Sequence, residues 1–126
     1  MNLNQVTLGT TNIAQTKVFY QLLGFILIVD TPHYLRFACP VGEASFSFVL
    51  EQQVSSTTTV YFEHEALDNA VDALLEKGVE FIELPADKPY LWREAVLSDP
   101  SGNKIKLFWA GKNRLNPPWK VPVKAI

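Results

Sequence analysis

The sequence predicts an α+β fold made of two successive β-α-β-β-β units. In each half of the chain, a short segment with alternating apolar residues precedes a helical segment that ends at a glycine, Gly24 or Gly78. Three further strand-like segments follow each glycine. An offset of 54 residues, which superimposes the two glycines, also pairs apolar positions such as Val6 with Val60 and Tyr20 with Leu74. This repeated order favours a duplicated unit.

The first unit begins with a strand predicted over residues 3–9. Residues 10–12 (TTN) are of the types that cap helix N-termini, so a helix is predicted from residue 13 to Gly24. Strands are expected over residues 25–30, 34–40 and 45–51. Turn residues separate them at Thr31-Pro32 and at Val41-Gly42-Glu43.

The second unit is predicted to start with a strand over residues 58–64. A helix over residues 66–78 follows, because its apolar residues recur at i, i+3, i+4 and i+7. Strands are expected over residues 79–84, 93–98 and 104–109, and the sequence DPSGN at 99–103 joins the last two as a turn. We therefore predict one domain over residues 1–109, with units 1–54 and 55–109, and a Pro-rich basic tail over 110–126 whose NPPWKVP segment lies extended.

Composition limits the class of protein. The 126 residues are enough for one hydrophobic core, and 48% hydrophobic with 19% charged residues is ordinary for a globular protein. The longest apolar run, residues 25–29, is too short to span a membrane, and residues 1–4 do not resemble a secretory signal. Cys39 is the single cysteine, so no intrachain disulfide can form. We expect a cytoplasmic protein without a membrane partner.

The charge distribution is uneven. The net charge of −2 argues against a nucleic-acid partner. From Ala110 onward the chain has four cations and no acid, so residues 1–109 carry 7 cations, 13 acids and a net charge of −6. We expect the basic tail to dock on its own acidic body or on a partner subunit.

Two motifs resemble the vicinal oxygen chelate superfamily, which includes glyoxalase I, extradiol dioxygenases and bleomycin-resistance proteins. The first is FY-x-x-LGF at residues 19–25, and the second is DP-x-GN-x-I-x-L at residues 99–107. The resemblance covers roughly residues 3–109 and implies the glyoxalase/bleomycin-resistance fold, in which the two units curl into an open, cupped mixed sheet. It also implies a homodimer whose cavities take strands from both subunits.

Metal-dependent members of this superfamily place one metal ligand in the first and one in the last strand of each unit. Carried onto this sequence, the four positions are Gln5, Ser47, Thr59 and Lys106. Hydroxyl groups seldom bind such metals, and a lysine cation repels them. We therefore expect no metal ion and no other cofactor.

Strand alternation predicts which side chains share the face of these four positions, because residues two apart point the same way. That face is polar and aromatic, whereas the opposite face is apolar and suits a core. A polar, partly aromatic concave surface is typical of organic-ligand sites. The expected ligand-binding residues are Gln5, Thr7, Ser47, Thr59, Tyr61, Glu63, Trp92, Glu94, Lys106 and Phe108.

Several of these residues have two interpretations. Lys106 either holds an anion or carbonyl group of a ligand or pairs with Glu63 or Glu51. Tyr90 and Trp92 either stack on a ligand or pack against the tail, where Trp119 also needs burial. Glu63-His64-Glu65 resembles a metal cluster, but neighbours in a strand point to opposite faces, so a strand end leading into a helix is the favoured interpretation.

We predict metal-independent binding or sequestration of a small aromatic or zwitterionic molecule, as the resemblance to bleomycin-resistance proteins implies, with a possible part in antibiotic resistance. No catalytic residue is assigned. Two alternatives stay open at this point. One is a metal-dependent glyoxalase-like lyase, isomerase or dioxygenase that uses Gln5, Glu63 or His64. The other is a structural domain, which a cavity filled by its own Tyr61, Phe108 and Trp92 would favour.

Overall fold

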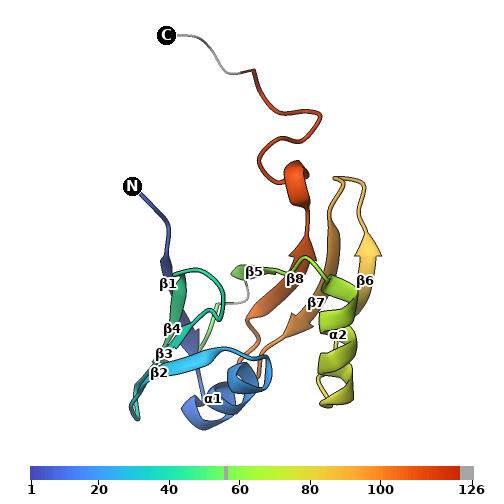
Figure 1. The fold of residues 1–126 in the computed structure, drawn as a ribbon. Coiled ribbons are helices and arrows are strands. Elements are labelled where there is room, and N and C mark those ends of the chain that lie inside the picture. Colours follow the sequence, from blue (N-terminus) through green and yellow to red (C-terminus); the bar gives the residue numbers. More distant parts are fainter. Residues whose placement is uncertain (56, 123–126) are drawn as a thin grey trace.

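The structure, a computed structural model, describes residues 1–55 and 57–122 and confirms the predicted α+β class (Figure 1). The order of elements is β-α-β-β-β twice over. The first unit contains β1 (Gln5–Thr10), α1 (Ile13–Leu22), β2 (Ile26–Asp30), β3 (Tyr34–Ala38) and β4 (Ser45–Leu50). The second contains β5 (Thr59–Glu63), α2 (Leu67–Glu76), β6 (Glu83–Asp87), β7 (Arg93–Ser98) and β8 (Lys104–Trp109), and the short 3₁₀ turn η1 (Gly111–Asn113) follows.

Strand β6 differs from its prediction. A strand was expected over residues 79–84, but the structure starts it at Glu83 and ends it at Asp87. The Val79 amide instead donates to the Leu74 carbonyl at 3.0 Å, which closes the end of α2, and the Val79 side chain enters the core. Pro85, which has no amide hydrogen, fits within β6 because β6 is the last strand of its sheet.

Each unit forms a four-stranded mixed sheet, and both sheets are open rather than closed into a barrel. The strand orders are β1-β4-β3-β2 and β5-β8-β7-β6, so β1 and β5 are equivalent edge strands. Each edge strand is parallel to its neighbour and places Thr7 opposite Ser47, or Tyr61 opposite Lys106. The predicted alternation therefore holds in both units.

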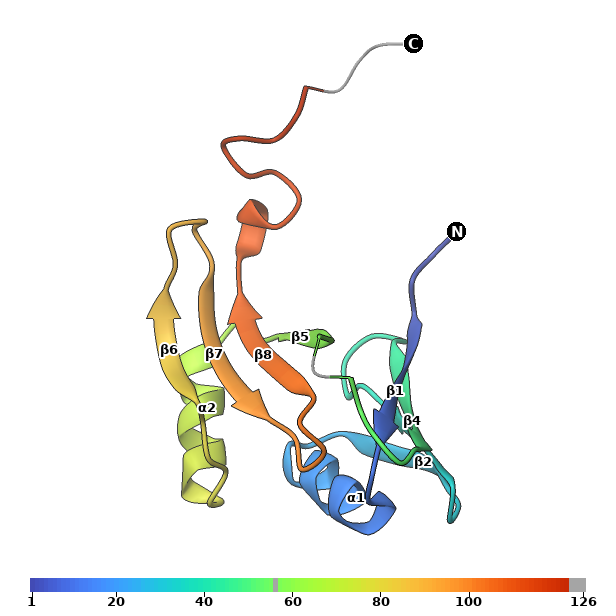
Figure 2. The same cartoon turned by 180° about the vertical axis from the view of Figure 1, so that it is seen from behind.

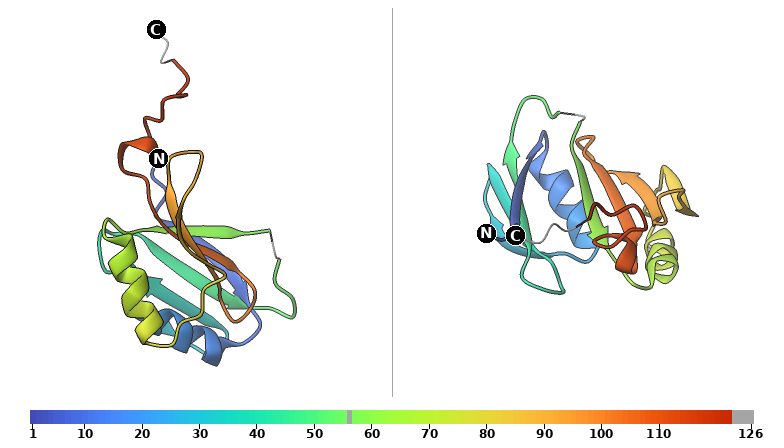
Figure 3. Two further views of the ribbon diagram at one scale, coloured as in Figure 1. Left: turned by 90° about the vertical axis from the view of Figure 1, so that its right-hand side faces the viewer. Right: turned by 90° about the horizontal axis from the view of Figure 1, so that it is seen from above.

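One face of each sheet packs into a common core. Phe46 and Phe48 of the first sheet and Ile105 of the second are buried there with the apolar faces of both helices. Figures 2 and 3 show α1 at the base between the two sheets, while α2 lies against the second sheet. The opposite faces carry most of the predicted site residues.

Helix α1 begins at a side-chain cap, whereas the N-cap residue of α2, Ala66, makes no side-chain cap hydrogen bond. The Asn12 side chain accepts a hydrogen bond from the Gln15 amide at 2.9 Å, as the predicted cap requires. Before α2, His64 Nδ1 accepts from the Ala66 amide at 3.0 Å. The favoured interpretation of residues 63–65, a strand end leading into a helix, is therefore correct. No helix in the described parts of the chain combines the length and apolar character that crossing a membrane requires.

Buried hydrogen bonds join the two units at the predicted turn between β7 and β8. Tyr20 of α1 donates through its hydroxyl to Asp99 Oδ2 at 2.7 Å, and both side chains are buried. Asn103 donates to the Gly9 carbonyl at 2.9 Å, and the hydroxyls of Thr10 and Ser101 lie 3.1 Å apart. A buried polar group without a partner is costly, so these bonds specify how the units pack.

The tail differs from expectation in two respects. Trp119 is 58% exposed rather than buried, and the Lys120 amide donates to the Pro117 carbonyl at 3.0 Å, so this part of NPPWKVP is a turn rather than extended. Figure 1 shows the described part of the tail, up to residue 122, leading away from both sheets. Lys124, one of its four cations, lies outside the described residues.

Candidate functional site

In the first sheet, the predicted metal-ligand positions satisfy each other. Gln5 Nε2 donates to Ser47 Oγ at 2.5 Å, and Ser45 Oγ donates to Gln5 Oε1. Ser47 Oγ is also 2.6 Å from the Tyr34 hydroxyl, which accepts from Arg36 Nε at 3.0 Å. The bond with Ser47 and the nearby Arg36 guanidinium lower the pKa of Tyr34, against a weaker effect of desolvation. The result is a connected polar network across β1, β4 and β3.

In the second sheet, Lys106 of β8 pairs with Glu94 of β7 rather than with Glu63 or Glu51, so the expected partners were wrong. Lys106 Nζ lies 3.1 Å from Glu94 Oε2, and the Tyr90 hydroxyl donates to Glu94 Oε1 at 2.7 Å. Desolvation lowers the pKa of Lys106, but the adjacent Glu94 carboxylate outweighs it and raises the pKa above its usual value. Lys106 is therefore a cation at neutral pH.

Glu94 is the most buried charged residue of this group. The residue is 1% exposed, because its side chain lies on the same face as the aromatic residues of β5 and β8. Glu94 Oε2 forms the ion pair with Lys106 Nζ, and among the described residues it has no other polar partner. A buried carboxylate oxygen with free acceptor capacity can receive one further donor.

An aromatic cluster surrounds this ion pair. The rings of Trp92 and Phe108 are stacked with centroids 4.8 Å apart, and Tyr61 meets Trp92 edge-on at 5.9 Å. Phe108 is buried beneath the cluster, whereas Tyr61 is 45% exposed. Lys106 Nζ lies 5.5 Å from the centroid of the Tyr61 ring, within cation–π range. The condition for a structural domain, self-contact of Tyr61, Phe108 and Trp92, is therefore met in part.

Trp92 contacts the start of the tail, as one of its two interpretations expected, while stacking on a ligand stays a prediction. It stacks on Phe108, and its Nε1 also donates to the Asn113 carbonyl at 3.3 Å, at the start of the tail. The β6–β7 turn that carries Tyr90 and Trp92 includes Leu91 with φ of 68°. This left-handed conformation is unfavourable for leucine, so packing on both sides holds the turn in place.

A cavity of about 440 Å³ lies between the two edge strands, and we refer to it as the β1–β5 cavity. Four predicted site residues line it, namely Gln5, Thr7, Thr59 and Tyr61. Apolar side chains of both strands, including Val6 and Val60, supply most of its remaining wall. Because Tyr61 also contacts the aromatic cluster, this ring connects the β1–β5 cavity with the Lys106–Glu94 pair.

Not all of the predicted ligand-binding residues lie together around one cavity. Ser47 is fully buried beneath its hydrogen-bond partners, and Glu63 lines a different cavity, near α2. Tyr34 and Arg36 belong to the polar network of the first sheet but were not among the predicted site residues. Alternation within residues 34–38, where Leu35 and Phe37 are apolar and buried, was the signal that could have identified their face.

The donor set does not fit the metal ion that the resemblance implies. Gln5 and Ser47 are occupied with each other, Thr59 offers a neutral hydroxyl, and Lys106 places an ammonium at the fourth position. Within residues 1–55 and 57–122, no group of three or more His, Cys, Asp and Glu side chains is close enough to hold a metal.

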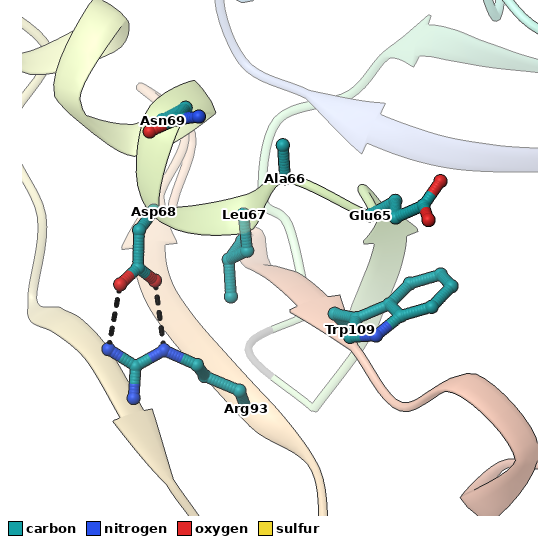
Figure 4. A pocket seen from close by; sticks show the side chains of 7 residues that line it. All are labelled: Glu65, Ala66, Leu67, Asp68, Asn69, Arg93 and Trp109. Atoms are coloured by element: carbon teal, nitrogen blue, oxygen red, sulfur yellow. Dashed lines mark hydrogen bonds and ion pairs between the residues drawn. The ribbon is translucent and has the colours of Figure 1, made fainter.

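A smaller hollow of about 260 Å³ lies beside the first turn of α2 (Figure 4). There Arg93 of β7 donates to both carboxylate oxygens of Asp68, at 2.9 and 3.0 Å, and also to Asp87 at 3.0 Å. The bond from Arg93 lowers the pKa of Asp68. These charges pair with one another. The ion pairs therefore fix α2 against β7, and they leave neither Arg93 nor Asp68 free to bind a ligand in this hollow.

Comparisons with known proteins agree with this architecture. The family model of the Glyoxalase/Bleomycin resistance protein/Dioxygenase superfamily matches residues 2–107. No curated protein matches the chain. Among solved structures, a glyoxalase/bleomycin resistance protein/dioxygenase from Nocardioides is 21% identical with a TM-score of 0.75, over 97% of this chain and 90% of the other.

Two further structures are similar in fold. A bleomycin-binding protein complexed with bleomycin is 15% identical with a TM-score of 0.70, over 86% of this chain and 98% of the other. A bleomycin resistance determinant encoded on the transposon Tn5 is 15% identical with a TM-score of 0.72, over 86% and 97%. At such identities the likeness shows the fold, while the ligand depends on the side chains of the site.

Proposed function

We propose a function from the premise that the chain belongs to the glyoxalase/bleomycin resistance protein/dioxygenase superfamily, as its two motifs predicted and as the match over residues 2–107 shows. We infer that the chain binds and sequesters a small organic molecule without a metal ion and without transforming it. The molecule combines an aromatic part with charged groups of both signs.

The Lys106–Glu94 pair is the observation that carries this proposal. It places a cation at a position where metal-dependent relatives have a ligand, next to a buried carboxylate with free acceptor capacity. Such a pair can orient an anionic group through Lys106, and a donor group through Glu94 when the ligand displaces the side chains that cover its carboxylate. A zwitterionic ligand satisfies both.

The aromatic part of the ligand is expected against Tyr61 and in the β1–β5 cavity. The cavity has mainly apolar walls, and its volume falls within the range of small-molecule sites. Tyr61 presents an exposed ring at the boundary between this cavity and the ion pair. An aromatic ring with a charged substituent can therefore reach both features.

The test is a thermal-shift screen that starts with metal-free bleomycin and zwitterionic aromatic compounds. A ligand at 100 times its dissociation constant adds about 2.7 kcal/mol to the free energy of unfolding. We expect Lys106→Met and Tyr61→Ala to reduce this gain. Lys104→Met is the matched control, because Lys104 is an exposed lysine on the same strand and face. Equal reductions by Lys104→Met and Lys106→Met would contradict the proposal.

The competing structural role is favoured by the mutual contacts of Tyr61, Trp92 and Phe108. The same screen separates the two functions. If the cluster only completes the core, Tyr61→Ala lowers the melting temperature and no compound raises that of the unmodified chain.

We further propose that two copies of the chain form a dimer through the tail. The described part of the tail leads away from both sheets and carries the exposed Leu115 and Trp119 with three cations, whereas residues 1–109 carry a net charge of −6. A second acidic body is therefore a suitable partner for the tail. In light scattering we expect twice the monomer mass for the whole chain. Removal of residues 114–126, which retains the Asn113 carbonyl, should shift the protein toward monomer, while an unchanged monomeric mass in both forms would contradict this proposal.

A further inference from the structure

The duplication makes two junctions between the units comparable, one at each helix. At the end of α1 the Phe25 amide donates to the Tyr20 carbonyl at 3.1 Å, and at the end of α2 the Val79 amide donates to the Leu74 carbonyl at 3.0 Å. Gly24 and Gly78 have φ of 101° and 87° at these ends, as the capping geometry requires. Tyr20 and Leu74 therefore occupy equivalent positions.

The turns that face the two helices are also equivalent. The Asp99 amide donates to the Asn103 carbonyl at 2.9 Å in the β7–β8 turn, and the Cys39 amide donates to the Ala44 carbonyl at 3.0 Å in the β3–β4 turn. Asp99 and Cys39 each directly follow the preceding strand. The pair formed by Tyr20 and Asp99 at one junction thus corresponds to Leu74 and Cys39 at the other.

The first junction is filled by a phenol ring. Tyr20 is 1% exposed, and its centroid lies 4.7 to 6.2 Å from those of Phe25, Phe37, Phe46 and Phe48. Its hydroxyl reaches the Asp99 carboxylate. The aromatic ring is therefore the group for which this junction is shaped.

The second junction has shorter side chains and contains a cavity of about 450 Å³, which we call the α2 junction cavity. Leu74 and Cys39 line it together with Phe25, Phe62 and Leu107. Apolar cavities of about 150 Å³ already bind benzene, so the space is sufficient for a ring. Burial raises the pKa of the Cys39 thiol, so no charge replaces that of Asp99 here.

We propose that the α2 junction cavity is a second ligand site and binds an uncharged molecule with one aromatic ring. The ligand's ring is expected beside Leu74, in the part of the second junction that corresponds to the position of the Tyr20 ring at the first. Glu63 and His64 line the same cavity and offer hydrogen bonds to a hydroxyl substituent. This site is separate from the Lys106–Glu94 pair and does not depend on its ligand.

The experiment measures alkylation of Cys39 by iodoacetamide in the full chain, because Cys39 is the single cysteine. The probes are p-cresol, which is the free form of a tyrosine side chain, toluene, and cyclohexanol as a non-aromatic control. At ten times its dissociation constant, p-cresol should slow alkylation about tenfold, since only the empty fraction reacts. Toluene should protect as well, and cyclohexanol should not.

Leu74→Tyr tests the location, because it supplies the ring covalently. Cys39 lines both cavities, whereas Leu74 lines the α2 junction cavity and is absent from the walls of the β1–β5 cavity. We expect slow alkylation of the variant and no further protection by p-cresol. Leu75→Tyr is the matched control, because Leu75 is exposed on the same helix and should keep the protection of the unmodified chain.

Three results would overturn the proposal: no protection of the unmodified chain by p-cresol, equal protection by cyclohexanol, or undiminished protection in Leu74→Tyr. If Leu74→Tyr fails to fold, Ala70→Leu, which narrows the same cavity from one turn earlier on α2, must weaken the protection. Lys106→Met must leave p-cresol protection unchanged, so failure here and failure of the zwitterionic site are separate outcomes.

Discussion

Lys106 is a single residue that disfavours metal binding at the site and favours binding of an anionic group instead. Its ammonium lies where the family resemblance implies a metal ligand, and the buried Glu94 carboxylate neutralises it. Removing one member of a buried pair leaves the other charge uncompensated, whereas removing both does not.

We therefore predict that Lys106→Met lowers the free energy of unfolding by about 2–3 kcal/mol, less than for a fully buried pair because Lys106 retains some exposure. The double variant Lys106→Met with Glu94→Leu should recover most of this loss. Urea unfolding checks both values, and Lys104→Met should change the free energy by no more than about 0.5 kcal/mol. A double variant as unstable as the sum of both single changes would argue against a paired role.

At the scale of elements, the β6–β7 turn concentrates conformational strain. Among the non-glycine residues that the structure describes, Leu91 is alone in having a positive φ, at 68°. It separates Tyr90, which binds Glu94, from Trp92, which stacks on Phe108. The contacts of Tyr90 and Trp92 hold Leu91 in this unfavourable conformation, and both aromatic rings consequently point toward the site.

Substitutions at this position should have opposite effects on stability. Leu91→Asn should raise the free energy of unfolding by about 0.5–1 kcal/mol, because asparagine tolerates the left-handed conformation. Leu91→Val should lower it by about 1 kcal/mol or more, because β-branching makes that conformation worse. Melting temperatures of the two variants decide this, and equal shifts of the same sign would show that the turn relaxes.

The elements also show what local sequence can predict. Alternation and glycine-terminated helices were sufficient for both units, because these patterns depend on neighbours along the chain. The prediction placed strand β6 too early, at residue 79. Val79 packs in the core next to α2, and the periodicity of the sequence does not reveal that contact. Likewise Lys106 was assigned to Glu63 or Glu51. The DPSGN turn predicted that β7 lies close to β8 in space, but it did not give the register that brings Glu94 within reach of Lys106.

At the scale of the whole molecule, Tyr20 and Asp99 join the units through residues 79 positions apart. Burial, together with the Asp99 carboxylate, raises the pKa of Tyr20 far above its usual value. The protonated phenol is thus retained in the folded state at pH values where an unfolded chain releases the proton. Its contribution to stability is complete below the unfolded pKa of about 10 and is lost progressively as the pH rises toward the folded pKa.

We predict that the free energy of unfolding falls steeply between about pH 10.5 and 12, with Tyr20 contributing up to about 1.4 kcal/mol per pH unit. Tyr20→Phe should remove that part of the slope and lower stability at pH 7 by about 1–2 kcal/mol. Chemical denaturation across this range provides the measurement. Tyr34→Phe is the control, because its shift has the opposite sign, and an unchanged slope in Tyr20→Phe would assign the alkaline loss to other groups.

The hydrogen bonds between the units also affect how the chain folds while it is being synthesised on the ribosome. The first unit emerges with Tyr20 and the Gly9 carbonyl lacking the partners that Asp99 and Asn103 supply later. Its aromatic core residues also await Phe62 of the second unit. The nascent first half therefore stays incomplete, and exposed to chaperones and proteases, until almost the whole of the second half has been translated.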